Sequence, residues 1–144
     1  MKIYLSCAIR GGRELQPNYQ AILDYLNNNG HTILTYHVAS PNVLEIEESM
    51  SDNEIFTQDI LWLQECDVVI AEVSTPSLGV GYEIAYALGR NKPVLGVYDE
   101  NKEKKVSAMI TGNTSPHLTL RSYHSIPQLV WHIKNFISTL SDFD

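Results

Sequence analysis

Two acidic residues, Asp59 and Glu83, occupy positions that suit catalysis. On a helical wheel with about 100° between residues, Asp59 falls on the apolar side of the segment 55–66. The apolar residues on that side are Ile55, Phe56, Trp62, Leu63 and Cys66. A carboxyl group turned toward a protein interior has a raised pKa, as many catalytic acids do. The alternative is a structural Asp that caps a backbone group or pairs with an Arg.

Glu83 follows the loop 74–81, which is rich in hydroxyl groups and glycine, and is expected in the first turn of a helix. An acid at that place often serves only to stabilise the helix dipole. Paired carboxylates from separate elements, however, are the groups that cleave glycosidic bonds, one as nucleophile and one in proton transfer. A third acid, Glu72, ends an expected strand nearby and either tunes a neighbouring pKa or faces solvent.

Two loops have the composition of an anion site. The first, 7–13, contains Gly11 and Gly12 between Arg10 and Arg13, so that backbone N–H groups and fixed positive charge suit a phosphate. Taken alone, it is equally well a tight turn with solvated arginines. The second, 74–83, lacks the spacing of a dinucleotide fingerprint and the Lys of a Walker A loop, so a phosphate site of another type remains open.

Short apolar runs alternate with amphipathic stretches along the chain. Strands are expected over 2–6, 32–36, 67–73, 93–98 and 118–123. Helices are expected over 13–29, from 51 or 52 to about 65, from the loop 75–81 to about 91, over 106–110 and over 127–140. Residues 37–50 are expected to form an irregular, acidic loop. This order predicts an α/β fold: a doubly wound three-layer sandwich, flavodoxin-like or Rossmann-like, around a five-stranded, mainly parallel sheet.

Length and composition exclude several other classes. The 144 residues suit one domain spanning 1–144, and the net charge of −7 argues against a broad nucleic-acid surface. No apolar run approaches the length of about 18 residues that a membrane helix needs. Two cysteines, with no CxxC pair and with scattered His, predict reduced thiols, a cytoplasmic location and no metal site.

Several segments together resemble the 2′-deoxynucleoside 5′-monophosphate N-glycosidases, a family within the nucleoside 2-deoxyribosyltransferase superfamily. They are IYLSCAIRGGRE, TYHVAS, QDILWLQECDVVIAEVSTPSLGVGYEIAYAL and VSAMITG, within residues 3–112. The resemblance implies hydrolysis of a deoxynucleoside monophosphate to a free nucleobase and 2-deoxyribose 5-phosphate, with no cofactor. It also implies a covalent intermediate in which the deoxyribosyl group is attached to Glu83.

The same resemblance implies roles for individual residues. Glu83 corresponds to the nucleophile, Asp59 to the acid that positions it or assists proton transfer, and Tyr4 to a Tyr that supports the catalytic carboxylate. Substrate contacts are implied for Cys7, Ala8, Ile9, Arg10, Gly11, Gly12, Arg13, His37, Ser77 and Gly79, and for Ser107, Ala108 and Met109 from the second subunit of a homodimer. One departure concerns Ala8, because similar loops carry a hydroxyl residue there; its backbone amide is then left to contact the phosphate.

Two alternatives to hydrolysis remain at this point. The same nucleophile would serve a nucleoside 2-deoxyribosyltransferase, in which a second base replaces water. A non-catalytic nucleotide-binding module is the alternative from another class, although the presence of both Glu83 and Asp59 favours an enzyme.

Overall fold

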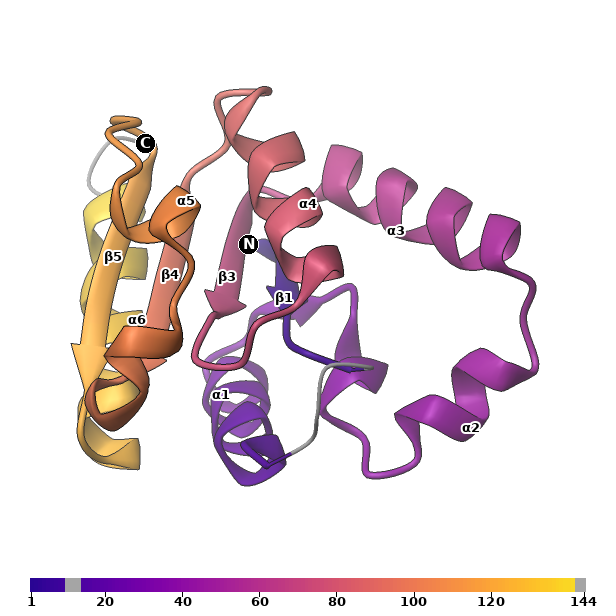
Figure 1. Ribbon diagram of the computed structural model, residues 1–144, viewed down its shortest axis with the longest axis horizontal. Coiled ribbons are helices and arrows are strands. Elements are labelled where there is room, and N and C mark those ends of the chain that lie inside the picture. The colour runs from indigo at the N-terminus through magenta and orange to yellow at the C-terminus, as the bar shows by residue number, and fades with distance from the viewer. Residues whose placement is uncertain (10–13, 142–144) are drawn as a thin grey trace.

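The computed structural model describes residues 1–9 and 14–141, and its centre is a parallel β-sheet. The strands lie in the order β2-β1-β3-β4-β5, and every pairing between neighbours is parallel (Figure 1). Their bounds are Lys2–Ser6 for β1, Thr32–Ile33 for β2, Val68–Glu72 for β3, Val94–Asp99 for β4 and Leu118–Tyr123 for β5. The predicted doubly wound fold is confirmed, with the strand order of the flavodoxin type.

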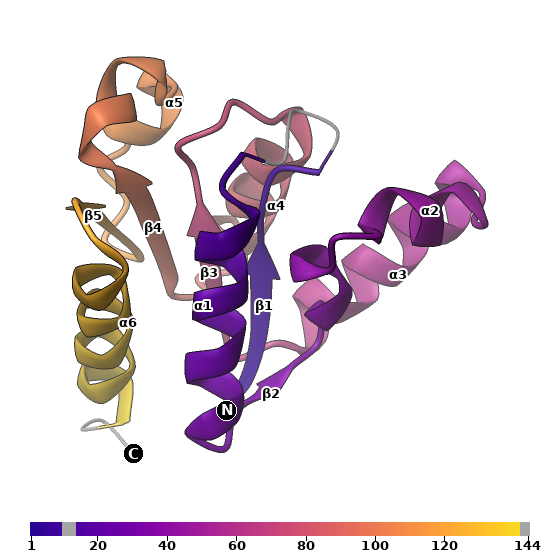
Figure 2. The ribbon, with the colours of Figure 1, turned by 90° about the horizontal axis from the view of Figure 1, so that it is seen from below.

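Helices cover both faces of the sheet (Figure 2). Helices α1 (Gln16–Asn28) and α6 (Ile126–Ser141) share one face, whereas α3 (Asp52–Glu65) and α4 (Leu78–Leu88) pack together on the other. The short helix α5 (Ala108–Thr111) lies on the second face, beside α4. Among the described residues, no helix is both long and apolar enough to cross a membrane.

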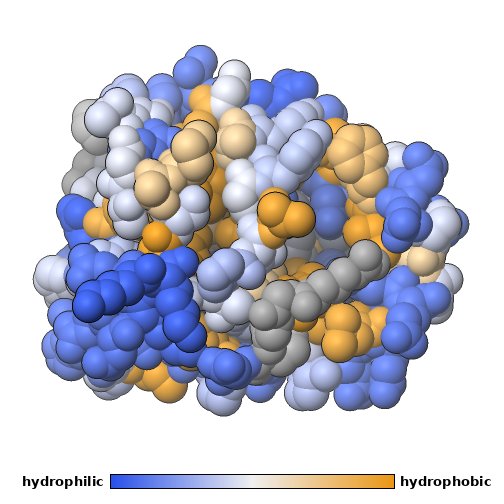
Figure 3. Space-filling view, viewed as in Figure 1, coloured by the Kyte–Doolittle hydropathy of each residue, from blue (hydrophilic) through white to orange (hydrophobic). Residues whose placement is uncertain are grey.

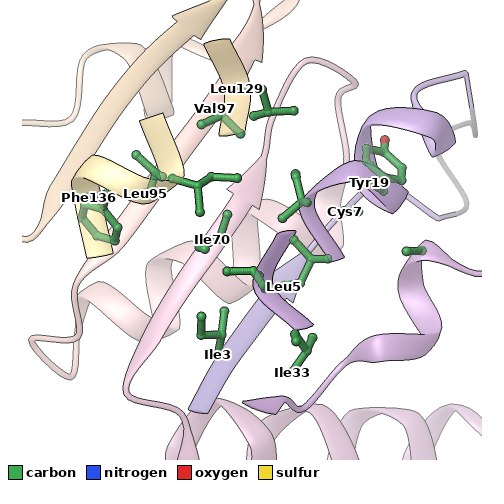
Figure 4. Close-up of a cluster of buried hydrophobic side chains, with 14 of the residues drawn as sticks. Ile3, Leu5, Cys7, Tyr19, Ile33, Ile70, Leu95, Val97, Leu129 and Phe136 are labelled. Carbon is green, nitrogen blue, oxygen red and sulfur yellow. The ribbon is translucent and has the colours of Figure 1, made fainter. Parts of the chain in front are cut away.

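Alternation along β1 assigns its side chains to two separate cores. Ile3 and Leu5 point toward α1 and α6, where they pack with Ile70, Leu95 and Leu129 (Figure 4). Tyr4 and Ser6 point the other way because successive residues of a strand face opposite sides of the sheet. The strand therefore contributes aliphatic packing to one face and two hydroxyl groups to the face that carries α3 and α4.

The second strand is shorter than the expected 32–36. Thr35 ends it, because its hydroxyl accepts a bond from the Leu5 backbone N–H (2.9 Å) and donates one to the Leu5 carbonyl (2.7 Å). The side chain thus takes the backbone partners that a longer β2 would have used. The chain then turns into a 3₁₀ helix, η1 (Tyr36–Ala39), and the helix α2 (Val43–Glu48), so the expectation of an irregular loop over 37–50 is wrong.

Other boundaries follow local capping. Ser51 begins α3 with a reciprocal capping box that includes Glu54, as the sequence allows. Helix α4 ends at Leu88, short of 91, and the chain leaves it through Asn91 at a positive φ of 57°. The charged residues after β4 form a second 3₁₀ helix, η2 (Glu100–Lys105).

Candidate active site

The candidate site lies where the sheet reverses its winding order. The connection from β1 leads outward to β2, whereas β3 lies on the other side of β1. Ligands of doubly wound folds bind at such a switch point, outside the carboxyl ends of the strands. Here β1 ends in Ser6, β3 ends in Glu72, and the loop after β3 leads into α4.

Glu83 reaches this place from the second turn of α4. The helix begins at Leu78, after Ser77, whose hydroxyl caps it by accepting a bond from the Val80 N–H (3.3 Å). The expectation that Glu83 lies in the first turn is therefore wrong, because the helix begins earlier than the glycines of the loop suggest. In the second turn the Glu83 carboxylate lies past the free N–H groups of the first turn, which are the groups an acid stabilises at a helix N-terminus.

Two hydroxyl groups of β1 hold the carboxylate of Glu83. Tyr4 donates from Oη to Oε1 at 3.0 Å, and Ser6 donates from Oγ to Oε2. Both donors are buried, and both belong to an interior strand, so their positions are fixed by the sheet. The role of Ser6 has a signal in the sequence that the prediction missed: it stands two residues after Tyr4 and so shares its face.

Asp59 joins this pair from α3, as the helical wheel predicts. The pKa of Glu83 is raised to about 7, chiefly by burial and in part by the charge of Asp59, against hydrogen bonds from Ser6 and Tyr4 that lower it. Burial also raises the pKa of Asp59 to about 6, with a further contribution from the charge of Glu47 on α2. Burial and the negative charge of Glu83 raise the pKa of Tyr4, which keeps its proton and acts as a donor.

A cavity of about 750 Å³ opens in front of these carboxylates. Its lining is mostly apolar and includes Asp59 and Glu83, and Phe56 and Tyr82 are half-exposed with ring centroids 6.3 Å apart. Figure 3 shows patches of hydrophobic surface on this face of the molecule. The lining residues are Cys7, Ile9, Glu47, Asp52, Ile55, Phe56, Asp59, Ile60, Leu63, Pro76, Ser77, Leu78, Gly79, Val80, Tyr82 and Glu83.

The structure brings together part of the predicted substrate-binding set. Cys7, Ile9, Ser77 and Gly79 line the cavity, and Ala8 is fully buried between two of them. Among the described residues, His37 lies outside the lining; its ring packs against Trp62, with centroids 5.6 Å apart, and burial lowers its pKa. The predicted contacts Arg10, Gly11, Gly12 and Arg13 lie outside the described residues.

The remaining predicted contacts, Ser107, Ala108 and Met109, lie at the start of α5. Ser107 and Met109 line a second hollow of about 590 Å³, not the cavity of Glu83. The two hollows adjoin, because Pro76, Ser77, Leu78 and Val80 belong to both linings. Leu78 is 96% exposed and Met109 is 80% exposed, so this junction presents apolar side chains to solvent.

Glu72 does not belong to the cavity, although the sequence places it near the other acids. It is fully buried on the face of α1 and α6, where it accepts bonds from the Ser74 hydroxyl, the Ser74 N–H (3.3 Å) and the Tyr123 hydroxyl (2.9 Å). Strand alternation separates it from Glu83 by the thickness of the sheet. Glu47, by contrast, lines the cavity and was not predicted, since it occurs in a stretch that reads as a solvated acidic loop.

The arrangement suits nucleophilic displacement at a carbon atom. A carboxylate with both oxygens oriented faces an apolar cavity, and a second acid with a pKa near neutrality stands beside it. Such a pair attacks an anomeric carbon and manages the accompanying protons. Within residues 1–9 and 14–141, no group of three or more His, Cys, Asp or Glu residues is placed to hold a metal ion.

Sequence comparison agrees with this chemistry. The model of the family described as nucleoside 2-deoxyribosyltransferase matches residues 3–120. A putative 2′-deoxynucleoside 5′-phosphate N-hydrolase 1 of Thermofilum pendens is 43% identical over 130 residues, 90% of each chain. The 5-hydroxymethyl-dUMP N-hydrolase of Rattus norvegicus is 43% identical over 112 residues, covering 76% of this chain and 68% of that protein.

Solved structures share the fold at low sequence identity. The CMP N-glycosidase BcmB of Clostridium botulinum superposes with a TM-score of 0.73 at 17% identity, covering 94% of this chain and 99% of that one. The solution structure of BlsM gives a TM-score of 0.75 at 18% identity, with coverage of 98% and 91%. These two likenesses support the doubly wound architecture.

Proposed function

This chain belongs to the nucleoside 2-deoxyribosyltransferase family, and we propose that it hydrolyses the N-glycosidic bond of 2′-deoxynucleoside 5′-monophosphates. The products are a free nucleobase and 2-deoxyribose 5-phosphate. The observation that carries the proposal is the carboxylate of Glu83, which is held by Tyr4 and Ser6 and lines a cavity that Asp59 also lines. The names of the relatives from Thermofilum pendens and Rattus norvegicus support the same bond and the same substrate class.

The reaction begins with attack of a Glu83 oxygen on the anomeric carbon of the sugar. The bond from that carbon to the base nitrogen breaks, its electron pair leaves with the base, and a glycosyl ester of Glu83 forms. Water then attacks the same carbon and releases the sugar phosphate and the free carboxylate. Asp59 assists proton transfer, which its pKa of about 6 suits, because both of its protonation states are populated near neutral pH.

The cavity provides separate environments for the base and the phosphate. The apolar wall that contains Phe56 and Tyr82 suits a flat nucleobase. Ser77 and Gly79, at the N-terminus of α4, suit the phosphate, because free N–H groups and the helix dipole favour an anion there. The loop 7–13 adds Ile9 to the cavity lining, and Arg10 and Arg13 belong to the proposal on the basis of sequence alone.

We further propose that the active form is a homodimer in which Ser107, Ala108 and Met109 complete the site of the neighbouring subunit. The support is the exposed apolar junction between the two hollows, formed by Leu78 and Met109, which a second copy would cover. Replacement of Met109 by Lys is expected to produce monomers and to lower activity together, measured by light scattering and by base release. Monomers of wild-type protein with full activity would contradict this arrangement.

The chain is also proposed to act as one catalytic domain over 1–144 in the cytoplasm. The family match over residues 3–120 and the shared sheet support the first point. The buried thiols of Cys7 and Cys66, which form no disulfide with each other, support a reducing compartment.

The test of the activity is a panel of deoxynucleoside and ribonucleoside monophosphates, with free base followed by chromatography. We expect release of base from at least one deoxynucleoside monophosphate, and no release from any of them would refute the proposal. Glu83→Gln keeps the shape of the side chain and is expected to abolish turnover, whereas the exposed Glu100→Gln serves as a matched control. Mass spectrometry after an acid quench tests the covalent step, because the glycosyl ester adds the mass of the sugar phosphate to wild-type protein and not to Glu83→Gln.

The family description also keeps base exchange as a second candidate, since the same carboxylate would serve it. An unphosphorylated deoxynucleoside offered with a second free base separates the two reactions. Formation of the new nucleoside would favour the transferase, and release of free base alone would favour the hydrolase. Tight binding of a deoxynucleoside monophosphate without turnover would instead favour a binding module.

A further inference from the structure

We propose that Ser6 is a positioning residue, which together with Tyr4 fixes the plane of the Glu83 carboxylate and keeps it ready for attack. This inference rests on the proposed role of Glu83 as the nucleophile. It concerns a residue that belongs to none of the groups predicted from the sequence. Its basis is the pairing of two donors from one strand with the two oxygens of one carboxylate.

The strand geometry makes this pairing rigid. Tyr4 and Ser6 are two residues apart on β1, so they project from the same face of the sheet. In the register with β3 they lie opposite Val69 and Ala71. Because β1 is paired with β3 from Ile3 to Ser6, the sheet fixes the backbone from which both donors project. Ser6 is 1% exposed, so water does not compete for its hydroxyl.

Two donors restrain Glu83 in a way that one donor does not. The terminal torsion of a Glu side chain has a broad, shallow energy profile, so a carboxylate held at one oxygen still rotates. Tyr4 binds Oε1 and Ser6 binds Oε2, so rotation would break at least one hydrogen bond. The remaining lone pairs then point in a fixed direction relative to the cavity, which is the condition for attack on a bound sugar.

The Ser6 bond also favours the ionised carboxylate. Burial raises the pKa of Glu83, and among the causes that oppose this rise the hydrogen bond from Ser6 is the largest. The groups that act on the pKa of Glu83 are Tyr4 on β1, Asp59 on α3 and Glu47 on α2. Three further titratable side chains line the same cavity: Cys7, Asp52 on α3 and Tyr82 on α4. Tyr4 supports the charge, whereas Asp59 and Glu47 oppose it.

A purely structural role is the competing explanation, because a buried hydroxyl needs a partner in any case. The two explanations differ in the pH profile. If the bond to Glu83 only gives the buried Ser6 hydroxyl a partner, Ser6→Ala changes kcat by the same factor at every pH. If Ser6 positions and supports the charge of Glu83, Ser6→Ala moves the acidic limb of kcat/KM to higher pH. A shift of one unit lowers the ionised fraction at pH 7 by about fivefold when the starting pKa is about 7.

The experiment compares wild type, Ser6→Ala, Ser6→Thr and Tyr123→Phe. Ser6→Thr keeps the hydroxyl and is expected to restore the wild-type limb. Tyr123→Phe is the matched control, because it removes a buried hydroxyl that donates to a buried carboxylate, Glu72, on the opposite face of the sheet. It is expected to lower stability and leave the limb in place. The inference is overturned if Ser6→Ala keeps the wild-type limb, or if Tyr123→Phe shifts it equally.

A carboxyl ¹³C NMR titration of Glu83 without substrate separates this inference from the proposed function. The resonance is assigned by its loss in Glu83→Gln. In Ser6→Ala its pKa is expected to rise above that of wild type, whether or not the protein releases base from any nucleotide. An unchanged pKa overturns the role of Ser6 even in an active enzyme. If Ser6→Ala does not fold, Ser6→Cys, with its weaker donor, is measured in the same way and has the same expected direction.

Discussion

Replacement of Asp59 by Asn is the most direct perturbation of the proposed site. It removes one negative charge from the cavity while nearly preserving the shape of the side chain. The charge of Asp59 raises the pKa of Glu83, so its loss is expected to lower that pKa and to move the acidic limb of kcat/KM to lower pH. In the same variant the plateau of kcat is expected to fall by about 10²–10⁴-fold, because a proton-transfer group is lost.

The structure sets the direction of the first effect and limits its size. The pKa of Glu83 lies at about 7, against an ordinary value of 4.5, and burial is the largest cause of this difference. The Asp59→Asn substitution would remove only the contribution of the neighbouring charge, so the limb is expected to stop well above 4.5. A pKa of about 7 leaves about 3% of Glu83 ionised at pH 5.5, so a downward shift of the limb raises activity relative to the plateau at that pH. The rise would be about eightfold for a shift of one unit.

The assay is base release from a deoxynucleoside monophosphate at intervals from pH 5 to pH 9, with kcat and KM determined separately. Asp24→Asn is the matched control, because Asp24 is an exposed acid on α1, across the sheet from the cavity. It makes the same change in net charge and is expected to leave the limb in place. An acidic limb in Asp59→Asn that stays at the wild-type pH, or moves upward, would refute the electrostatic coupling of the two carboxylates.

Two further predictions concern stability. In the capping box at the start of α3, the Ser51 hydroxyl accepts from the Glu54 N–H (3.2 Å), and the Ser51 backbone N–H donates to the Glu54 carboxylate (2.8 Å). Ser51→Ala removes the hydroxyl, so we expect the free energy of unfolding to fall by about 1 kcal/mol and the Tm measured by calorimetry to fall by about 2–4 °C. Burial raises the pKa of Glu72 from 4.5 to about 6, so the folded state binds its proton more tightly than the unfolded state. The contribution of Glu72 to the free energy of unfolding should therefore fall by about 2 kcal/mol as the pH rises from about 4 to 7. Urea titrations across this pH range should show that the free energy of unfolding falls less in Glu72→Gln than in wild type.

The sequence predicts the sheet well because its strongest signals are local. The apolar runs that become β1, β3 and β4 are bounded by turns, and the residues between them repeat with a helical period. The second strand begins at Thr32 as predicted, but its expected end at 36 is wrong because Thr35 replaces backbone pairing with its own hydroxyl, a tertiary contact with Leu5 that no local pattern reveals. Helix α2 fails because its exposed, acidic surface has the composition of a loop.

The candidate site shows the same division. Asp59 is predicted correctly as an inward-facing acid, because a wheel at helical spacing needs only one element. The contact of Ser6 with Glu83 joins residues 77 positions apart, and depends on where α4 begins relative to the end of β1. The position of Glu72 is predictable in principle, since alternation from Ile70 places it on the face of α1 and α6.

Each face of the sheet carries a carboxylate held by hydroxyl donors, and the two carboxylates differ in their access to the cavity. Glu83 is held by one serine and one tyrosine, and so is Glu72, through Ser74 and Tyr123. Burial raises the pKa of both carboxyl groups, to about 7 and about 6. The hydroxyl donors therefore cannot by themselves make one acid a nucleophile. Glu83 opens onto a cavity of about 750 Å³, whereas Glu72 is fully enclosed at the end of β3, where the Tyr123 hydroxyl of β5 reaches it across β4. A substrate can reach the first carboxylate and not the second. The two hydroxyl groups bind different oxygens of Glu83 and so orient the proposed nucleophile, whereas both bind Oε1 of Glu72 and tie β5 to the end of β3.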